Sequence, residues 1–367
     1  MTRKNPNVGE TETVAVDSML DEETRAILKP VRELIVDEWG LYIGKHSERL
    51  RVLKKGTLLQ EVPLAALQQV LVMSGGVSLS SDAVEECASR GIPIHFLDFS
   101  GRVYATLLSG QLTGTVKTRR EQLLAYTDER GLLLGKAFAS GKIYNQLNLL
   151  RYMGKSRGAA QQEEMRQGLA NLETMADELA RLPGTKVDEV RGLLLSLEGR
   201  AAQLYWELAR GLLLVETDWP GRQGQGASDL VNSLFNYGYG ILYTKVEQAL
   251  ILAGLDPFAG FVHTDRPGKP SLVYDLIEEF RQPIVDRTVF AMLNLKMELT
   301  LDTQGRLTAE TRRLLARKLL ERLGESRERY EGKRQSLQFI LYSQARHLAT
   351  FVRGDLGRDY TPFLTGW

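Results

Sequence analysis

The sequence predicts an α+β protein, in which a mainly β amino-terminal domain is followed by an all-α domain. Two observations predict this class. Up to about residue 108, apolar residues form short runs rich in β-branched side chains, with glycines between the runs, which is typical of strands and turns. From about Thr118 onward, apolar positions recur every three or four residues, which is the period of a helix. A chain of 367 residues can form two or three domains with a sizeable core.

The amino-terminal domain is expected to span residues 34–110. Residues 1–28 show little apolar periodicity and are expected to form a flexible tail. One helix, Ser81–Ser89, interrupts the strands, with a Ser and Asp cap at its start and Gly91 after its end. The expected strands are Leu34–Val36, Leu41–Gly44, Leu50–Leu53, Val70–Met73, Ile92–Leu97 and Val103–Leu107.

The helical domain is expected to span residues 118–345, with residues 346–367 as a carboxy-terminal tail. Its clearest helix has one apolar stripe that includes Val190, Leu194 and Ala201. Between the first two clear helices, residues 219–226 are rich in Gly and Gln and are expected to form a flexible loop. The three clearest helices are about Lys186–Leu214, Asp229–Gly254 and Ser271–Phe280.

The composition excludes several classes of protein. The chain has 47 Lys and Arg residues against 46 Asp and Glu residues, a formal net charge of +1, so bulk charge indicates neither nucleic acid nor a membrane as partner. Cys87 is the only cysteine, which excludes an intramolecular disulfide and a multi-thiolate metal site and fits a reducing compartment. The sequence shows no signal peptide and no apolar run near the ~18 residues of a membrane helix. We therefore expect a soluble, cytoplasmic protein with no membrane association.

Four residues of the helical domain could carry chemistry. Glu198 lies beside the apolar stripe of its helix, although a structural glutamate paired with Arg200 or another base is the simpler interpretation. His263 follows a short apolar run after a turn, and a capping or core histidine is the alternative. Asp275 and Glu278 are three residues apart on one helical face, where a solvated acidic first turn is the alternative.

In combination, these residues predict a site for a divalent metal ion. One helical Glu, one loop His and a carboxylate pair within about 80 residues could supply oxygen and nitrogen ligands to one ion, and no thiolate is available. This donor set suits Mn²⁺ or Mg²⁺ better than structural zinc, which favours a closed cage of four ligands. An open site of this kind implies Lewis-acid chemistry on a phosphate.

Basic and aromatic side chains near these candidates support a phosphodiester as substrate, because Lys and Arg hold a nucleic-acid backbone. The two tyrosines Tyr237 and Tyr239 lie beside small residues and could approach a nucleic acid, or simply permit tight helix packing. The basic residues near the candidate ligands are Arg200, Arg266, Lys269 and Arg281.

A local excess of positive charge lies in residues 101–160, which carry ten Lys and Arg residues against three acids. Lys117, Arg119 and Arg120 belong to this segment, which we expect to position DNA. A second basic cluster, residues 312–334, is diluted by glutamates at helical spacing, and a solvated helix face is the better interpretation there.

At these residues the sequence resembles the CRISPR-associated integrase of the spacer-acquisition complex, also described as a metal-dependent DNA endonuclease. The β-rich first third also resembles the opening domain of that family, so the resemblance covers about residues 34 to 350. The motifs that carry it are Leu-Glu-Gly-Arg-Ala-Ala around Glu198, Asn232–Tyr239, Gly260-Phe-Val-His263, Pro270–Arg281, Leu41-Tyr-Ile-Gly44 and Gly91-Ile-Pro-Ile94.

The resemblance implies a site and a set of partners. The metal-binding Glu of the family falls on Glu198, its His on His263, and its helical carboxylate on Glu278, where some members have Asp. Asp275 matches a further acidic position and is a possible ligand. The family works in antiviral defence as a homodimer formed through the β-rich domains, and two dimers flank a small ferredoxin-like second adaptation protein. The 3′-hydroxyls of a short foreign duplex attack the repeat array without ATP, because one phosphodiester is exchanged for another.

We therefore predict a nuclease and integrase in which Glu198, His263 and Glu278 are catalytic and hold Mn²⁺ or Mg²⁺. Arg266 and Lys269 would steady the scissile phosphate or the incoming strand of double-stranded DNA. The rival is a non-catalytic DNA-binding scaffold in which the acids are structural. An unrelated metal hydrolase that acts on a small phosphoester would leave the basic segment unexplained.

Overall fold

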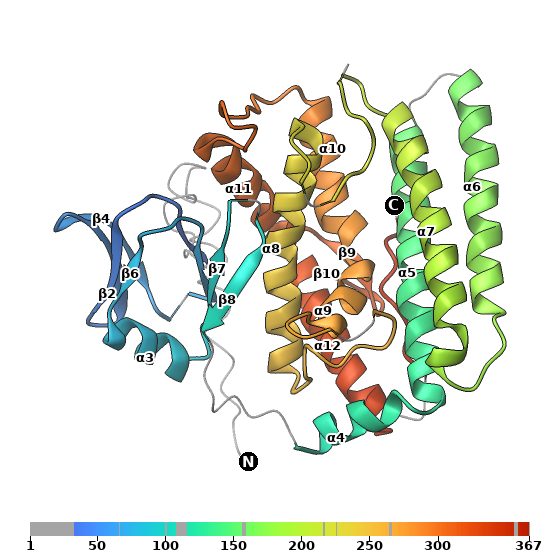
Figure 1. Cartoon of the computed structure of the whole chain (residues 1–367), viewed down its shortest axis with the longest axis horizontal. Helices are drawn as coiled ribbons and strands as arrows, with labels where there is room; N and C mark the ends of the chain where they lie inside the picture. The colour runs from blue at the N-terminus through green and yellow to red at the C-terminus, as the bar shows by residue number, and fades with distance from the viewer. Residues whose placement is uncertain are drawn as a thin grey trace, which may run out of the picture. The chain divides into compact units, whose positions relative to one another are not determined.

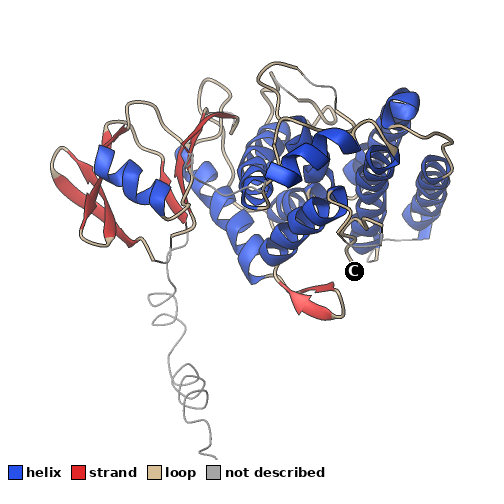
Figure 2. Ribbon diagram, turned by 90° about the horizontal axis from the view of Figure 1, so that it is seen from below, coloured by secondary structure: helices blue, strands red, loops and turns tan. Residues whose placement is uncertain are grey.

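The computed structural model describes residues 33–65, 67–99, 101–107, 116–155, 159–215, 217–224, 226–263, 266–355 and 359–366. The tail predicted for residues 1–28 lies outside the described residues. The chain divides into two compact units, one up to Ile94 and one from His95. Strands dominate the first unit and helices the second (Figure 1, Figure 2). The predicted α+β class is confirmed.

The first unit is built on two sets of paired strands. An antiparallel meander contains β2 (Leu41–His46), β3 (Arg49–Lys54) and β4 (Thr57–Pro63), and β6 (Ser78–Leu79) pairs in parallel with β2. Separately, β1 (Glu33–Val36) pairs in parallel with β5 (Gln69–Val72), with Leu34 opposite Val70. Helix α3 (Ser81–Ser89) begins where the Ser80 side chain accepts a hydrogen bond from the Ala83 N–H at 3.1 Å.

The sequence does not predict β4, whereas the structure has strands at each of the six predicted runs. The first four residues of β4 are exposed, so the strand lacks the apolar alternation that marks a half-buried strand. Its backbone bonds to β3, from Arg49 opposite Pro63 to Lys54 opposite Thr57, hold it in the sheet. This segment is therefore a strand because it pairs with β3, and not because of a local apolar pattern.

The boundary between the units lies earlier than the predicted one at residues 110–118. Strand β7 (Ile94–Leu97) begins at the boundary, and β8 (Val103–Leu107) contacts α8 (Leu230–Leu252) in the helical unit. The approach is so close that a Cβ on Gly240 would lie 1.5 Å from the Gly101 carbonyl oxygen. The last predicted strand therefore belongs to the helical unit.

Three long helices lie side by side in the helical unit, α5 (Glu129–Gly154), α6 (Ala159–Ala180) and α7 (Val187–Gly211), preceded by α4 (Val116–Ala125) (Figure 1). The apolar stripe predicted for α7 is buried, including Val190, Leu194 and Ala201. Helix α8 begins after the cap Asp229, whose side chain accepts a hydrogen bond from the Asn232 N–H. Among the described residues, no helix is both long enough and apolar enough to cross a membrane.

The third predicted helix begins at Ser271, but its hydrogen-bonding pattern changes three times before Asn294. It runs as α9 (Ser271–Leu276), a 3₁₀ turn η1 (Ile277–Glu279), a π-helical segment η2 (Arg281–Asp286) and α10 (Arg287–Asn294). Pro283 has no N–H to donate to the Glu279 carbonyl four residues earlier. The Asn145 side chain of α5 donates to that carbonyl instead, at 2.9 Å. The carbonyl left without a helical donor is thus satisfied from another helix.

The carboxy-terminal elements correct the prediction of a tail over residues 346–367. Helix α11 (Ala309–Glu325) is followed by the hairpin β9 (Glu328–Tyr330) and β10 (Lys333–Gln335), and α12 (Leu337–Val352) extends into the predicted tail. Further on, Tyr360 and Phe363 are buried. The Tyr360 hydroxyl and the Phe363 N–H donate to the carboxylate of Glu279, at 2.7 and 2.9 Å. Buried hydrogen bonds therefore attach this segment to the helical unit.

The loop after α7 has no regular secondary structure, as predicted, but the structure anchors it. Trp219 is buried, with its ring centroid 5.9 Å from that of Trp206. Arg222 donates to the Asn236 Oδ1 at 2.7 Å, and its guanidinium lies over the ring of Tyr239. The prediction of a flexible loop is therefore wrong for the described part, because aromatic packing and side-chain hydrogen bonds replace the missing backbone ladder.

Candidate metal centre

Glu198 lies in the middle of α7 at the edge of the buried stripe, and it is 9% exposed. Lys142 of α5 donates a hydrogen bond from Nζ to the Glu198 Oε1 at 2.5 Å. Arg200 is exposed, and it is two residues on, about 200° round the helix. The base that pairs with Glu198 is therefore Lys142 and not Arg200, and DNA binding by the exposed Arg200 stays a prediction.

Glu278 lies in η1 and is 3% exposed. Its Oε2 is 2.9 Å from the Lys142 Nζ, and its Oε1 is 3.2 Å from the Arg281 Nε. Lys142, itself 8% exposed, therefore contacts both Glu198 and Glu278. Two of the predicted ligands, from distant parts of the chain, converge on one buried positive charge.

His263 is held by Asp275, which is fully buried at the end of α9. The Asp275 carboxylate accepts hydrogen bonds from the backbone N–H groups of Phe261, Val262 and His263, at 2.6 to 3.1 Å. Its Oδ1 also lies 2.7 Å from the His263 Nδ1. Because an ionised carboxylate can only accept, Nδ1 carries the proton, and Nε2 keeps its lone pair.

The glycine before this segment permits the close approach. A Cβ on Gly260 would lie 2.7 Å from the backbone carbon of Ser271 and 2.9 Å from the Asp275 Oδ2. The two carboxylates predicted to lie on one helical face, Asp275 and Glu278, bind different partners. Asp275 binds the backbone of residues 261–263, whereas Glu278, beyond the change to 3₁₀ pitch, meets Lys142. These contacts assign Asp275 to orienting His263, as an outer carboxylate does for a metal-binding histidine.

The charges of the site support one another electrostatically. Burial alone would lower the pKa of Lys142, but the charges of Glu278 and Glu198 outweigh it and raise the pKa above its usual value. Burial would likewise raise the pKa of Glu278, yet Arg281 and Lys142 hold it below its usual value. For His263, burial opposes protonation, but the hydrogen bond and charge of Asp275 raise its pKa. Lys142 and Arg281 therefore favour the charged form of Glu278, which in turn favours that of Lys142. Asp275 favours the protonated form of His263.

The two tyrosines proposed to contact nucleic acid are part of the core, which corrects that expectation. Tyr237 is 1% exposed and Tyr239 is 8% exposed, so neither ring offers a face on which a base could stack. The Tyr239 hydroxyl donates to the buried Asp286 at 2.5 Å. Arg281 lies over the Tyr239 ring, 4.6 Å from its centroid, and is thereby held between the ring and Glu278.

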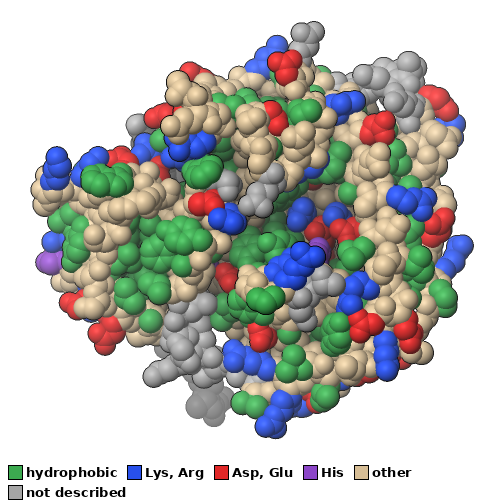
Figure 3. Space-filling view, in the orientation of Figure 1, with side chains coloured by type: hydrophobic (Ala, Val, Ile, Leu, Met, Phe, Trp, Pro, Cys, Tyr) green, Lys and Arg blue, Asp and Glu red, His purple; other side chains and the backbone are tan. Residues whose placement is uncertain are grey.

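Arg266 and Lys269 lie on the turn between the His263 segment and α9. The Lys269 N–H donates to the Arg266 carbonyl at 2.9 Å, and both residues line a cavity of about 420 Å³. Lys269 lies over the ring of Tyr274, which packs 5.7 Å from the His263 ring. In the space-filling view, basic and acidic side chains gather with a histidine in a hollow of the helical unit (Figure 3). These two basic residues therefore stay candidates for binding a phosphate backbone.

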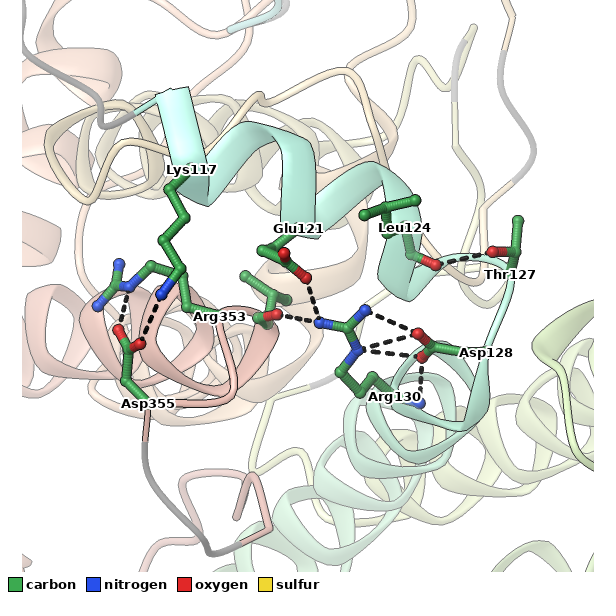
Figure 4. Close-up of polar contacts among 9 residues, drawn as sticks. Lys117, Glu121, Leu124, Thr127, Asp128, Arg130, Arg353 and Asp355 are labelled. Carbon is green, nitrogen blue, oxygen red and sulfur yellow. Dashed lines mark hydrogen bonds and ion pairs between the residues drawn. The ribbon is translucent and has the colours of Figure 1, made fainter.

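The basic segment of residues 101–160 is partly neutralised by acids from other elements (Figure 4). Lys117 pairs with Asp355 at 3.1 Å. Arg130 pairs with Glu121 and Asp128, two acids of the same segment. Among the described residues, Arg119 and Arg120 have no ion-pair partner and are exposed on α4. The charge available to a ligand here is therefore smaller than the sequence count indicates.

The donor chemistry of the site fits a hard divalent cation. Glu198 and Glu278 already share one positive charge at 2.5 and 2.9 Å, and His263 offers a free ring nitrogen. Among the described residues, no three His, Cys, Asp or Glu side chains are grouped closely enough to form a ready-made metal cluster. Carboxylate and imidazole ligands suit Mn²⁺ or Mg²⁺. The residues that would hold such an ion are Glu198, His263 and Glu278.

Sequence reasoning missed Lys142 as part of this site. A signal was present, because α5 is buried along most of its length and Lys142 falls in line with Phe138, Asn145 and Gln146. A lysine at a position that helical spacing places in a buried stripe needs a buried partner. Helical spacing alone does not show which carboxylates pair with Lys142.

Comparison with known proteins gives concordant matches. The family model described as CRISPR associated protein Cas1 matches residues 34–321. A relative from Archaeoglobus fulgidus, named CRISPR-associated endonuclease Cas1 1, is 37% identical over 348 residues, which cover 91% of this chain and 99% of the relative.

Solved structures share the fold. A casposase bound to integration product superposes with a TM-score of 0.73 at 22% identity, covering 90% of this chain and 93% of that one. A Cas6-RT-Cas1–Cas2 complex gives the same TM-score and identity, covering 91% of this chain and 36% of that one.

We expect Lys142→Met to destabilise the helical unit strongly, because it leaves two carboxylates buried without their counter-charge. Breaking a buried ion pair from one side typically costs about 3 to 5 kcal/mol, measurable as the free energy of unfolding in urea. The matched control is Lys136→Met in the same helix, since the Lys136 Nζ bonds only to the carbonyls of Leu182 and Ala180. An equal loss in both variants would contradict the ion cluster.

We expect Asp275→Asn to lower the pKa of His263, because the hydrogen bond and charge of Asp275 raise it. NMR titration of the four histidines measures this shift. The control, Asp302→Asn, removes a carboxylate that binds Arg306 instead. Because the pKa of His263 is raised in the folded state, its protonation stabilises the fold below the unfolded-state pKa of ~6.5. This stabilisation is lost as the pH rises through the folded-state pKa. The stability difference between wild type and Asp275→Asn should therefore shrink at alkaline pH, and an unmoved His263 pKa would refute the assignment.

Proposed function

Because this chain belongs to the CRISPR associated protein Cas1 family, we propose that it is a metal-dependent DNA endonuclease and integrase that inserts short foreign DNA duplexes into a CRISPR repeat array. The observation that carries this proposal is the meeting of Glu198 and Glu278 at one buried positive charge. His263 lies within their electrostatic reach, with its ring oriented by Asp275. The endonuclease name of the Archaeoglobus fulgidus relative supports the same activity.

A Mn²⁺ or Mg²⁺ ion held by Glu198, His263 and Glu278 would supply Lewis-acid chemistry at the reacting phosphodiester. The remaining tasks fall to side chains of this protein. Asp275 keeps a proton on the His263 Nδ1, so that Nε2 faces the reaction as a lone-pair donor. Arg266 and Lys269, on the turn that leads from His263 to α9, attract and hold the negatively charged backbone.

The proposed reaction is a transesterification. The oxygen of a 3′-hydroxyl on the incoming duplex bonds to a phosphorus of the repeat DNA and gives up its proton. The bond from that phosphorus to the neighbouring 3′-oxygen breaks, and this oxygen leaves with a proton. One phosphodiester replaces another, so no ATP is required. The casposase bound to integration product, which shares this fold at 22% identity, supports this class of reaction.

Double-stranded DNA with 3′ ends and CRISPR repeat DNA are the proposed substrates. The exposed Arg119 and Arg120 on α4 would contact their phosphates outside the reacting centre, since backbone contacts position a duplex without reading its sequence. We also propose a homodimer formed through the first unit, and a small ferredoxin-like second adaptation protein as partner. The Cas1–Cas2 complex among the structures that share this fold supports such a partner.

The rival function is a DNA-binding scaffold without catalysis, in which Glu198 and Glu278 serve only as partners of Lys142. Both functions predict DNA binding, so binding alone does not distinguish them. They differ in whether the carboxylates are needed for metal binding and for strand transfer.

We expect Glu278→Gln to keep its affinity for DNA in EDTA but to lose strand transfer by roughly 100-fold or more, as the loss of one charge-stabilising group typically does. Mn²⁺ should raise the melting temperature of the wild type and not of this variant. Glu279→Gln is the matched control. Glu279 is the buried carboxylate next to Glu278, but it accepts hydrogen bonds from Gln344 and Tyr360 instead of contacting Lys142. Normal strand transfer by Glu278→Gln would favour the scaffold.

We expect reversal of Arg119 and Arg120 to Glu to weaken DNA binding for all sequences. Two lost phosphate contacts should reduce the slope of log affinity against log salt by about 1.8. Titrations of a labelled duplex at several salt concentrations measure this slope. Lys117→Gln should change the slope less, because Lys117 is already paired with Asp355. Unchanged slopes in the double variant would place the DNA on another surface.

A further inference from the structure

The hairpin between α11 and α12 is a rigid β-ribbon within the helical unit. Strand β9 pairs antiparallel with β10, with Glu328 opposite Gln335, Arg329 opposite Arg334 and Tyr330 opposite Lys333. The two turn residues, Glu331 and Gly332, have φ values of 47° and 77°. Positive φ at both central residues is the type I′ geometry, which matches the twist of paired strands. Figure 2 shows the hairpin projecting beyond the surrounding helices.

The inner face of the hairpin is fixed to the helical unit by buried contacts. The Glu328 carboxylate is buried and pairs with Arg322 at 2.6 Å and Arg287 at 3.8 Å. The Tyr330 hydroxyl donates to the Gln344 Oε1 at 2.9 Å. The Glu328 carboxylate is therefore shared by two arginines of the helical unit, and these contacts attach the hairpin to that unit.

The outer face carries positive charge that nothing in the described part of the chain balances. Arg329 and Arg334 stand directly opposite each other and are exposed, and neither has an ion-pair or hydrogen-bond partner among the described residues. Arg327, just before β9, adds a third exposed cation. The one exposed acid of the hairpin, Glu331, lies 3.6 Å from His347.

Like charges directly opposite each other destabilise a strand pair. Charged residues on short edge strands prevent edge-to-edge association with other sheets. A facing pair of opposite charges would prevent it equally well and would also stabilise the pairing of β9 with β10. The facing arginines therefore lower the stability of the hairpin but give it a positively charged surface. An anionic partner bound to that surface would neutralise the repulsion. Residues 312–334 were expected to form a solvated helix face, but Arg327, Arg329, Lys333 and Arg334 lie on or next to the hairpin.

We propose that the outer face of the hairpin, formed by Arg329 and Arg334 with Arg327 just before β9, binds the phosphate backbone of duplex DNA without reading its sequence. This inference rests on the proposed function, which makes duplex DNA the partner. The major groove of DNA, about 12 Å wide, admits a two-stranded β-ribbon. Arginine forks bind phosphate oxygens in a bidentate manner. A pair of opposed arginines on a ribbon would thus reach the phosphates on either side of the groove.

The test compares two double variants that each remove two positive charges. Arg329→Gln with Arg334→Gln changes the hairpin. Arg166→Gln with Arg181→Gln changes α6 and the residue directly after it, where both arginines are exposed and already paired with Glu163 and Asp177. Binding of a duplex of arbitrary sequence is measured in EDTA at several salt concentrations. The hairpin variant should show a salt slope smaller by about 1.8, and the control variant should keep the wild-type slope.

Further measurements separate this inference from its alternatives. The hairpin variant should melt at the wild-type temperature or above it, because a like-charge pair is removed. If the wild type itself binds no DNA, the proposed function fails. If the wild type binds and transfers strands while the hairpin variant keeps the full salt slope, only the hairpin inference is overturned. A full salt slope together with lost binding of the small second adaptation protein would overturn it in favour of a protein interface.

Discussion

The candidate site depends on one buried ion cluster, in which the Lys142 ammonium contacts both Glu198 and Glu278. An isolated charge at such a depth would be expensive to desolvate, so each group has to stay within reach of the others. The cluster thereby fixes the relative positions of α5, α7 and the turn after α9. Burial alone would push the lysine and Glu278 toward their neutral forms, and mutual pairing reverses both tendencies.

The turn that carries Glu278 is supported from behind by a second set of buried polar groups. Asn145 donates to the carbonyls of Glu279 and Phe363, and the Glu279 carboxylate accepts from Gln344, Tyr360 and Phe363. Burial raises the pKa of Glu279 to about 7 in spite of these hydrogen bonds. The end of the chain therefore supports the site, because Tyr360 and Phe363 supply donors to the buried carboxylate next to Glu278.

The balance of charge in this protein is set by tertiary pairing and not by composition. Lys117 looks like a free cation in the sequence, yet Asp355 from the far end of the chain pairs with it, and Arg130 pairs with two acids of its own segment. Arg119 and Arg120 on α4, and the opposed arginines of the hairpin, are left without such acids among the described residues. Exposed ion pairs contribute little to stability. The positive charge that a basic patch can offer to an anionic partner is mainly that of its unpaired residues.

The sequence by itself determines the α+β class, the runs that become most of the strands and helices, and the choice of Glu198, His263 and Glu278 as candidates, because apolar periodicity, helix caps and donor chemistry are local properties. Only the tertiary structure decides that Lys142 joins the site, that Asp275 serves His263, and that Tyr239 belongs to the core. The partner of a buried charge is set by how helices far apart in sequence pack. Likewise, Pro283 shows from the sequence that the Glu279 carbonyl loses its helical donor, but only the packing of α5 shows that Asn145 replaces it.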